Sequence, residues 1–368
     1  SVKAVLLPNP KFRQEPIDLA AEGYDEAIHG QYNIKQIEGR IPPLLDRLEV
    51  HFIKESLSRW NSFTKDDEIE FSGIPKELTD EVLAQKQPEI LLKPDYAARY
   101  HMANMIESGF VHSDFNMRDP EIGYNPDPER NQMNKALRCA IRYAYNWEER
   151  NRTMYTDLGV IFPGIIPPVT PEFDPQGSTA SLEHNPEKGR RLLQQAGWTP
   201  EQLPVIDYGG VASVTTRQMF EQFRGWMTKL GYPKNKITFN SFATFGDFNK
   251  AVKQAKIKFV GMGWGLDYPD AENTLQLFYG PNGSPGSNNA NFDNPEYNEL
   301  YRKTAVMQPS AERTRLYRQM NDIVLDECVT ISGLSRRRIM LWHKSVVSFP
   351  DRQIVGGFHF KYVDKLDD

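Results

Sequence analysis

Residues 261–280 read GMGWGLDYPDAENTLQLFYG, and they begin inside an apolar segment, 257–262, that predicts a strand. The glycines on both sides of Trp264 allow a close backbone approach, and the indole offers a flat apolar face. Asp267 places a carboxylate three residues later. These groups could together receive a ligand that has an amino group and an apolar side chain. The alternative is structural: Trp264 lies in the core and Asp267 caps a turn before Pro269.

The glycines of this stretch do not form a nucleotide-binding motif. Gly261, Gly263 and Gly265 lack the third spaced glycine, and the chain runs into Asp267 and Pro269 instead of a helix that would hold a pyrophosphate. The chain also has no GxSxG elbow, Walker phosphate loop or kinase motif. Its seven histidines never pair at metal-ligand spacing. We therefore expect no cofactor and no metal site.

Outward from this stretch, strand and helix patterns alternate, which is typical of an α/β unit. Asn185 and Pro186 predict the start of a helix, and Gly197 predicts its end. The other segments follow from apolar spacing. The expected helices are 135–150, 186–196, 216–230 and 246–255, and two further helices are expected to begin at Asn294-Pro295 and near Ser310. The expected strands are 203–208, 237–242 and 257–262.

The first hundred residues show shorter patterns. We expect strands at 2–7, 47–53 and 68–73, with a helix around Trp60 between the last two. A strand, a helix and a strand in succession predict a right-handed crossover within one α/β sheet. The polar stretch through Gly30 and Gly39 is interpreted as a surface loop, and residues 101–134 are interpreted as a boundary. The tail from Arg336 onward is interpreted as strand that returns to a sheet.

Composition excludes several classes of protein. The 368 residues carry a formal charge of -5 without a long run of one sign, which disfavours nucleic acid and anionic membranes as partners. No apolar run approaches the ~18 to 20 residues that a bilayer span needs. The two cysteines, Cys139 and Cys328, are too few for a disulfide framework and fall within helical patterns. They leave the redox compartment undecided.

Other conspicuous residues have structural explanations. Four tryptophans lie in amphipathic patterns and are expected in the core: Trp60, Trp147, Trp226 and Trp342. Three adjacent arginines, 336–338, are interpreted as a solvated turn or a helix C-terminus instead of an anion site. The carboxylates of Asp267, Asp270 and Glu272 fit neither a calcium loop nor an acid/base pair with a partner on a second element.

Ordered motifs over nearly the whole chain resemble family 5 (cluster C) extracytoplasmic solute-binding proteins, the oligopeptide and dipeptide receptors of ABC importers. The segment 263–283 followed by SNNANFDNPEYNELYRKT (287–304) is similar to the signature of that family. Further motifs occur in family order: LLPNPKF (6–12), ARYHMANMIESGF (98–110) with SDFN (113–116), ALRCAIRYAYNWEERN (136–151), EHNPEKGRRLLQQAGW (183–198) and SAERTRLYRQMNDIVLDECVTISG (310–333).

The resemblance implies a periplasmic-binding-protein-like α/β fold (type II, cluster C) with two lobes of mixed sheets flanked by helices. Family members normally have roughly two hundred further residues before the NP strand, so the resemblance identifies this chain as a C-terminal fragment. It implies a partial domain I at residues 1–106, domain III at 107–334 and a return to domain I at 335–368. The two lobes are expected to close about a hinge near residues 105–115 and 332–340. The insertion around 23–43 departs from the better-known receptors.

The resemblance also implies a ligand site. Asp267 would pair with the α-amino group of a peptide, and Trp264 would form a wall of the pocket, with Gly265 and Tyr268 beside them. An arginine that oligopeptide receptors commonly carry before the tryptophan has no counterpart, because Gly261 and Gly263 flank Met262. A ligand carboxylate is therefore not expected to bind through that position.

The expected function is that of a non-catalytic, monomeric substrate-binding component of an ABC importer. It would capture peptides or peptide-like solutes in the periplasm or at the cell envelope and deliver them to permease subunits. Two alternatives stay open at this point. The same fold could bind a nickel chelate, haem or an oligosaccharide, because a fold does not fix a function. A hydrolase that uses the region of Asp267 would need a second titratable group, and the sequence nominates none.

Overall fold

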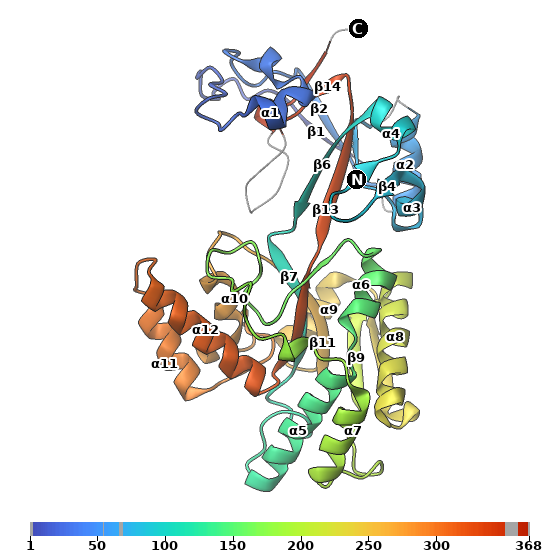
Figure 1. Cartoon of the computed structure of the whole chain (residues 1–368), viewed down its shortest axis with the longest axis vertical. Coiled ribbons are helices and arrows are strands. Elements are labelled where there is room, and N and C mark those ends of the chain that lie inside the picture. Colours follow the sequence, from blue (N-terminus) through green and yellow to red (C-terminus); the bar gives the residue numbers. More distant parts are fainter. Residues whose placement is uncertain (1–2, 54, 66–68, 350–359, 367–368) are drawn as a thin grey trace. The chain divides into compact units, whose positions relative to one another are not determined.

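The computed structural model describes residues 3–53, 55–65, 69–349 and 360–366. The chain separates into two compact units, whose elements Figure 1 labels. Unit 1 contains Ser1–Met105 and Arg337–Asp368, and unit 2 contains Ile106–Arg336. The chain thus passes from one unit to the other twice, after Met105 and after Arg336. Strands and helices alternate in both units, which confirms the expected α/β class.

A six-stranded mixed sheet forms the centre of unit 2, in the order β10-β9-β11-β7-β12-β8. β9 pairs in parallel with β10 and β11, whereas β7 pairs antiparallel with β11 and β12. Parallel neighbours need a crossover, and helices α8 and α9 supply it. The strands are β7 (Gly109–Phe115), β8 (Val160–Ile161), β9 (Ile206–Val211), β10 (Ile237–Phe242), β11 (Phe259–Gly265) and β12 (Thr330–Ser335).

Four helices cover one face of this sheet, and Figure 1 shows α5, α7 and α8 as one group. They are α5 (Pro128–Ala144), α6 (Trp147–Tyr155), α7 (Pro186–Gln195) and α8 (Val214–Leu230). Trp147 and Trp226 lie in their shared core, as expected. The single helix expected at 135–150 is wrong: α5 begins at Pro128 behind the N-cap Asp127, and Asn146 starts a second helix by accepting from Glu149 N.

A second core lies under α10 (Glu272–Leu275), α11 (Pro295–Thr304) and α12 (Ala311–Asp326). It contains Phe110 and Met117 from the β7 region and Tyr297 and Met320 from the helices. α9 (Phe245–Lys253) packs on β9 and β10 around a smaller cluster with Phe248. The helices expected to begin at Asn294-Pro295 and near Ser310 are confirmed, since α11 begins at Pro295 and α12 at Ala311.

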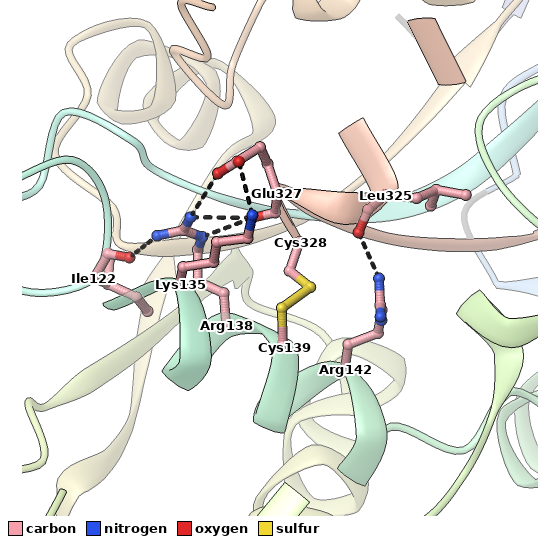
Figure 2. The surroundings of a disulfide bond; sticks show 8 residues. All are labelled: Ile122, Lys135, Arg138, Cys139, Arg142, Leu325, Glu327 and Cys328. Atoms are coloured by element: carbon pink, nitrogen blue, oxygen red, sulfur yellow. Dashed lines mark hydrogen bonds and ion pairs between the residues drawn. A yellow bond between two sulfur atoms is a disulfide. The ribbon is translucent and has the colours of Figure 1, made fainter. Parts of the chain in front are cut away.

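The two cysteines form a disulfide, which the sequence pattern did not predict. Cys139 lies in α5, and Cys328 follows the end of α12; the two are 189 residues apart in sequence (Figure 2). Only Cys139 is helical, because Cys328 adopts a positive φ of 50° beyond the last helical turn. The bond joins α5, which packs on one core of unit 2, to the residue that follows α12, which packs on the other, and no local spacing of cysteines reveals this.

Cations of α5 support the same junction by binding the carboxyl end of α12. Arg142 Nη1 donates to Leu325 O at 2.6 Å, and Arg138 Nη2 donates to Glu327 O at 3.0 Å (Figure 2). Lys135 Nζ binds Glu327 Oε1 at 2.8 Å. Since the carbonyls at a helix C-terminus carry partial negative charge, these contacts stabilise the end of α12.

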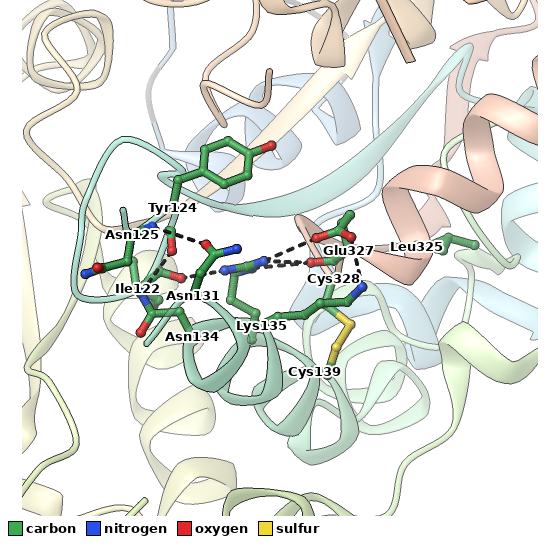
Figure 3. A network of polar contacts seen from close by, with 12 residues as sticks. Ile122, Tyr124, Asn125, Asn131, Asn134, Lys135, Cys139, Leu325, Glu327 and Cys328 are labelled. Atoms are coloured by element: carbon green, nitrogen blue, oxygen red, sulfur yellow. Dashed lines mark hydrogen bonds and ion pairs between the residues drawn. A yellow bond between two sulfur atoms is a disulfide. The ribbon is translucent and has the colours of Figure 1, made fainter. Parts of the chain in front are cut away.

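The loop before α5 is tied to the same network (Figure 3). Asn134 Nδ2 donates to Pro120 O and Gly123 O at 3.0 and 2.9 Å, and Asn125 N donates to Asn131 Oδ1 at 3.1 Å. Residues 116–127 are therefore an ordered loop with its own hydrogen bonds. The chain passes between the two units within the boundary expected at 101–134, after Met105, although β6 and β7 occupy residues 100–106 and 109–115.

Unit 1 has small sheets instead of one large one. Its strands are β1 (Lys3–Leu6), β2 (Leu48–His51), β3 (Phe71–Ser72), β4 (Leu83–Gln85), β5 (Leu91–Leu92), β6 (Tyr100–Ile106), β13 (Arg337–His343), β14 (Val346–Val347) and β15 (Asp364–Lys365). β13 lies between β3 and β6, so the expected return of the tail to a sheet is confirmed. Short helices α2 (Ser56–Thr64), α3 (Thr79–Val82) and α4 (Pro94–Arg99) complete the unit. Trp60 and Trp342 are buried, as expected.

Two expectations for unit 1 are wrong. β2 pairs with β1, and β3 pairs antiparallel with β13 in another sheet, so 47–73 is no crossover unit of one sheet. The stretch around Gly30 is not a surface loop either. It forms α1 (Glu26–His29) and two 3-10 turns, and it contributes Ile34 and Ile37, both fully buried, to the core around Trp342. Isolated apolar residues in a polar segment carry no periodicity that would predict this.

None of the helices in the described residues is both long and apolar enough to cross a bilayer.

Candidate functional site

Trp264 lies near the end of β11 and is fixed by a buried amide. Its Nε1 donates to Asn273 Oδ1 at 2.8 Å, and its ring packs against the core under α10–α12. Asn273 is 3% exposed and belongs to α10. The tryptophan is therefore partly core, as the structural interpretation had it, and is also oriented by a polar contact that the sequence did not predict.

Asp267 lies beyond the end of β11, and the same Asn273 holds it. Its backbone N donates to Asn273 Oδ1 at 3.2 Å, and Asn273 Nδ2 donates to Asp267 Oδ2 at 3.5 Å. The residue is exposed, and within the described part of the chain no Lys, Arg or His pairs with its carboxylate. An ordered, exposed carboxylate without a cation is able to receive an ammonium group.

Gly265 and Tyr268 have different surroundings. Gly265 is the last residue of β11 and pairs with Gly109, at which a Cβ atom would lie 2.0 Å from Trp264 O. Glycine is thus required at position 109, opposite Gly265. The hydroxyl of Tyr268 donates to the Glu272 carboxylate, which also accepts from Tyr301. Burial, followed by the hydrogen bond to Glu272, raises the pKa of Tyr268, so this phenol stays protonated at neutral pH.

The neighbouring carboxylates are used by the fold. Arg313 Nη2 binds Asp270 Oδ2 at 2.6 Å and Glu172 Oε1 at 3.1 Å. Glu172 Oε2 accepts from Ala271 N at 3.2 Å, which anchors the segment between Asp267 and α10. Asp270 and Glu272 therefore have separate structural partners and do not form a carboxylate pair with Asp267. In the described part of the chain, no group of three or more His, Cys, Asp or Glu side chains could hold a metal ion.

A pocket of about 300 Å³ opens beside β11, at the carboxyl end of β9. Gly261 and Gly263 line this pocket. Because alternate residues of a strand share a face, these two glycines leave one face of β11 without side chains there. A Cβ atom at Gly261 would meet the hydroxyl of Tyr208 at 3.4 Å and Ser113 Oγ at 3.7 Å. In open α/β sheets, ligands bind outside the carboxyl ends of strands, which is the position of this pocket.

Basic and hydroxyl groups dominate the polar lining. The pocket is lined by Arg150 of α6 and by Arg336, which lies between β12 and β13. The phenols of Tyr145, Tyr155 and Tyr208 also line it. Arg336 pairs with Glu107 through both Nε and Nη2, the latter at 3.0 Å. The interpretation of 336–338 as a turn or helix end is wrong, because β13 begins at Arg337.

The four expected ligand residues lie at the end of β11 or just beyond it, and they do not coincide with the pocket beside that strand. Trp264 and Asp267 are brought together by Asn273, whereas none of Trp264, Gly265, Asp267 and Tyr268 lines the pocket. Sequence reasoning missed Asn273 and Arg150. Both residues lie in helices whose sequence patterns predict a helix and no function. They are distinguished only by polar atoms that the structure buries.

Comparisons with known proteins agree on one family. The family model described as bacterial extracellular solute-binding proteins, family 5 Middle, matches residues 3–286. Heme-binding protein A of Haemophilus influenzae is 25% identical over 198 residues, which is 52% of this chain and 34% of that protein. Di/tripeptide-binding protein 1 of Pseudomonas aeruginosa is 23% identical over 206 residues, 55% of this chain and 37% of that protein.

A solved structure shows the same fold. The dipeptide-binding protein of Pseudoalteromonas sp. SM9913 in complex with Met-Leu matches with a TM-score of 0.68 and 18% identity, over 88% of this chain and 59% of that one. The expected periplasmic-binding-protein fold is thereby confirmed. In these alignments the chain spans about a third of the length of the two curated relatives and somewhat more than half of the solved structure.

Proposed function

The chain belongs to the bacterial extracellular solute-binding proteins of family 5, and from this premise we propose that it serves an ABC importer as its substrate-binding component. It captures peptides or peptide-like solutes outside the cytoplasmic membrane and delivers them to the permease subunits. The proposal includes the division expected above, with parts of domain I at 1–106 and 335–368 and domain III at 107–334. Ligand stabilises the closed state of the two lobes.

The observation that carries the proposal is the state of Asp267. Its carboxylate is exposed, is oriented by a buried amide and pairs with no cation of the described chain. The carboxylates of Asp270 and Glu172 are by contrast neutralised by Arg313. A carboxylate that the fold positions but does not use is suited to the α-amino group of a peptide.

The disulfide supports a place outside the cytoplasm. Cys139 and Cys328 are bonded in the structure. Structural disulfides persist in the periplasm and in extracellular space, whereas cytosolic thiols are kept reduced. The bond therefore supports an oxidising compartment, a question that the cysteine count left open.

Native mass spectrometry of the full-length protein from its source, followed by denaturation to release any co-purified solute, tests the proposal. A ladder of peptide masses is the expected result. A tetrapyrrole mass would identify haem instead of a peptide as the solute, an alternative that the similarity to Heme-binding protein A supports. A nickel or oligosaccharide mass would likewise keep the binding role and change the solute. Hydrolysis of an added peptide or glycoside library by the purified protein would contradict a non-catalytic role.

A further inference from the structure

Three arginine side chains of unit 2 are buried, and two of them are neutralised by carboxylates. Arg138 is 1% exposed and Arg313 is 7% exposed. Arg138 donates to Ile122 O at 2.8 Å and faces Glu327, whose carboxylate is 3.8 Å away. Arg313 pairs with Glu172 and Asp270. These two arginines hold the fold together.

Arg150 is the third, and it has no counter-charge in the described residues. It is 3% exposed, and no Asp or Glu of the described chain lies within 4.0 Å of its nitrogens. Nη2 donates to Met219 O at 3.4 Å, whereas Nε and Nη1 have no hydrogen-bond partner in that part of the chain. The rings of Tyr145 and Trp226 lie 5.4 and 5.2 Å from Cζ, and both are neutral.

A buried cation without an anion is costly, because its lost hydration is not replaced. An arginine cannot escape this cost by losing its proton in the physiological pH range. The side chain nevertheless occupies this position, where it lines the pocket beside β11. A feature that opposes stability in a folded protein is expected at a functional site.

The rest of the pocket suits an anion. None of the described residues that line it is acidic. Burial raises the pKa of Tyr155 to about 12 and raises the pKa of Tyr208, so both phenols keep their protons and are able to donate. Gly261 and Gly263 leave room for the group that these donors would hold.

The remaining lining is apolar. Val211, Phe245, Phe248 and Met262 contribute to the same pocket, and Phe245 is 62% exposed. A large exposed aromatic ring at a pocket is a surface that an apolar part of a ligand would cover. A pocket of about 300 Å³ fits a small group of this kind.

We propose that the solute bound beside β11 carries a carboxylate that pairs with Arg150, and an apolar part that packs on Phe245 and Met262. The inference rests on the proposed function and narrows its solute to organic acids, or to peptides held through a carboxylate. The expected absence of a carboxylate-binding arginine before Trp264 is thereby compensated by an arginine from α6.

Ligand probes of matched shape test this pairing. Thermal unfolding of the full-length protein is followed with sodium hexanoate, with neutral hexanamide and with inorganic phosphate at constant ionic strength. Hexanoate is expected to raise the melting temperature of the wild type. Arg150→Gln is expected to lower the affinity for hexanoate by about 10- to 100-fold. Arg152→Gln, an exposed arginine of the same helix, is the control and should respond like the wild type.

Three outcomes overturn the proposal. Hexanoate fails to stabilise the wild type, or it stabilises Arg150→Gln equally, or hexanamide acts as well as hexanoate. A shift with phosphate alone that depends on Arg150 would keep an anion site and reject the carboxylate.

A second measurement separates binding from a structural role and needs no ligand. Arg150→Met should leave the melting temperature of the ligand-free protein unchanged or raise it, since it removes an unpaired charge. Arg138→Met should lower it, because the carbonyls of Ile122 and Glu327 lose their donor. An equal decrease of the melting temperature in both variants would show that Arg150 has a structural role.

Released solutes distinguish this inference from the proposed function. A co-purified solute without an acidic group that Arg150→Gln also retains would reject the role of Arg150 and leave the transport role intact. The absence of any co-purified solute, together with an Arg150-dependent shift of the melting temperature by hexanoate, would support the role of Arg150 and count against the transport role.

Discussion

Asn273 shows how one buried side chain organises a site. Its Oδ1 accepts from Trp264 Nε1 and from Asp267 N, and its Nδ2 reaches the carboxylate of Asp267. It contributes nothing that a ligand would touch. It fixes the indole and the carboxylate relative to each other, which pre-organises the expected ligand contact.

Asn273→Ala is therefore expected to destabilise the protein by about 2 to 4 kcal/mol, because two part-buried N–H groups lose their acceptor. Urea unfolding measures the free energy, and near-ultraviolet circular dichroism reports the indole of Trp264. Asn282→Ala, whose amide lies in the same region but binds Gln276, serves as the comparison. A loss under about 1 kcal/mol together with an unchanged spectrum would contradict the anchoring role.

Asp267→Asn removes the charge and keeps the shape. An amine-bearing ligand should bind more weakly by roughly 1.5 to 3 kcal/mol, the range for a hydrogen bond to a charged group. Calorimetry with the solute released from the native protein measures this. Asp157→Asn makes the same change at another exposed position of unit 2 and should have no effect. Equal affinities of wild type and Asp267→Asn would remove Asp267 from the site.

At the scale of elements, α5 and the end of α12 form the joint that holds the two faces of unit 2 together. The disulfide connects them covalently, and Lys135, Arg138 and Arg142 bind the last turn of α12. Burial lowers the pKa of Arg138 to about 10, with Glu327 opposing the shift, so the guanidinium stays charged at neutral pH. Both the bond and the ion pairs stabilise a contact between segments far apart in sequence.

Replacing both cysteines by serine should destabilise the protein by about 2 to 5 kcal/mol, since the bond closes a long loop of the unfolded chain. Urea unfolding with and without dithiothreitol measures the effect. The reductant should lower the midpoint of the wild type and leave that of the double serine variant unchanged. Identical midpoints of the two proteins under oxidising conditions would show that the polar contacts suffice.

At the scale of the whole molecule, the two units have separate cores. The core of unit 1 surrounds Trp342, on which His101 packs at a ring distance of 5.5 Å. Burial, with a smaller effect of Lys344, lowers the pKa of His101 from 6.5 to about 4. Above pH 6.5 the imidazole is neutral in both the folded and the unfolded chain. As the pH falls from 6.5 to 4, only the unfolded chain gains the proton, so stability is lost in this window.

His101→Phe should therefore reduce the loss of stability between pH 6.5 and 4 by about 1 to 3 kcal/mol. Urea unfolding at several pH values, followed by tryptophan fluorescence, measures the difference. His184→Phe is the control, because His184 is exposed and belongs to unit 2. A wild type whose stability is constant over this window would contradict the role of His101.

The sequence alone determined the class of the fold and most elements of unit 2. The helix α11 begins behind the cap Asn294 and carries an apolar stripe, so local physics specifies where it starts. The family resemblance named Trp264 and Asp267 by their motif. Local patterns failed for the segment around Ile34 and Ile37, because its burial comes from contact with the distant Trp342.

Tertiary structure alone decided which distant groups meet. It bonded Cys139 to Cys328, and it placed Asn273 between Trp264 and Asp267. It also left Arg150 without a carboxylate while giving Arg138 and Arg313 theirs. Charge pairing depends on distances between segments that folding brings together, and periodicity within one segment carries no information about those distances.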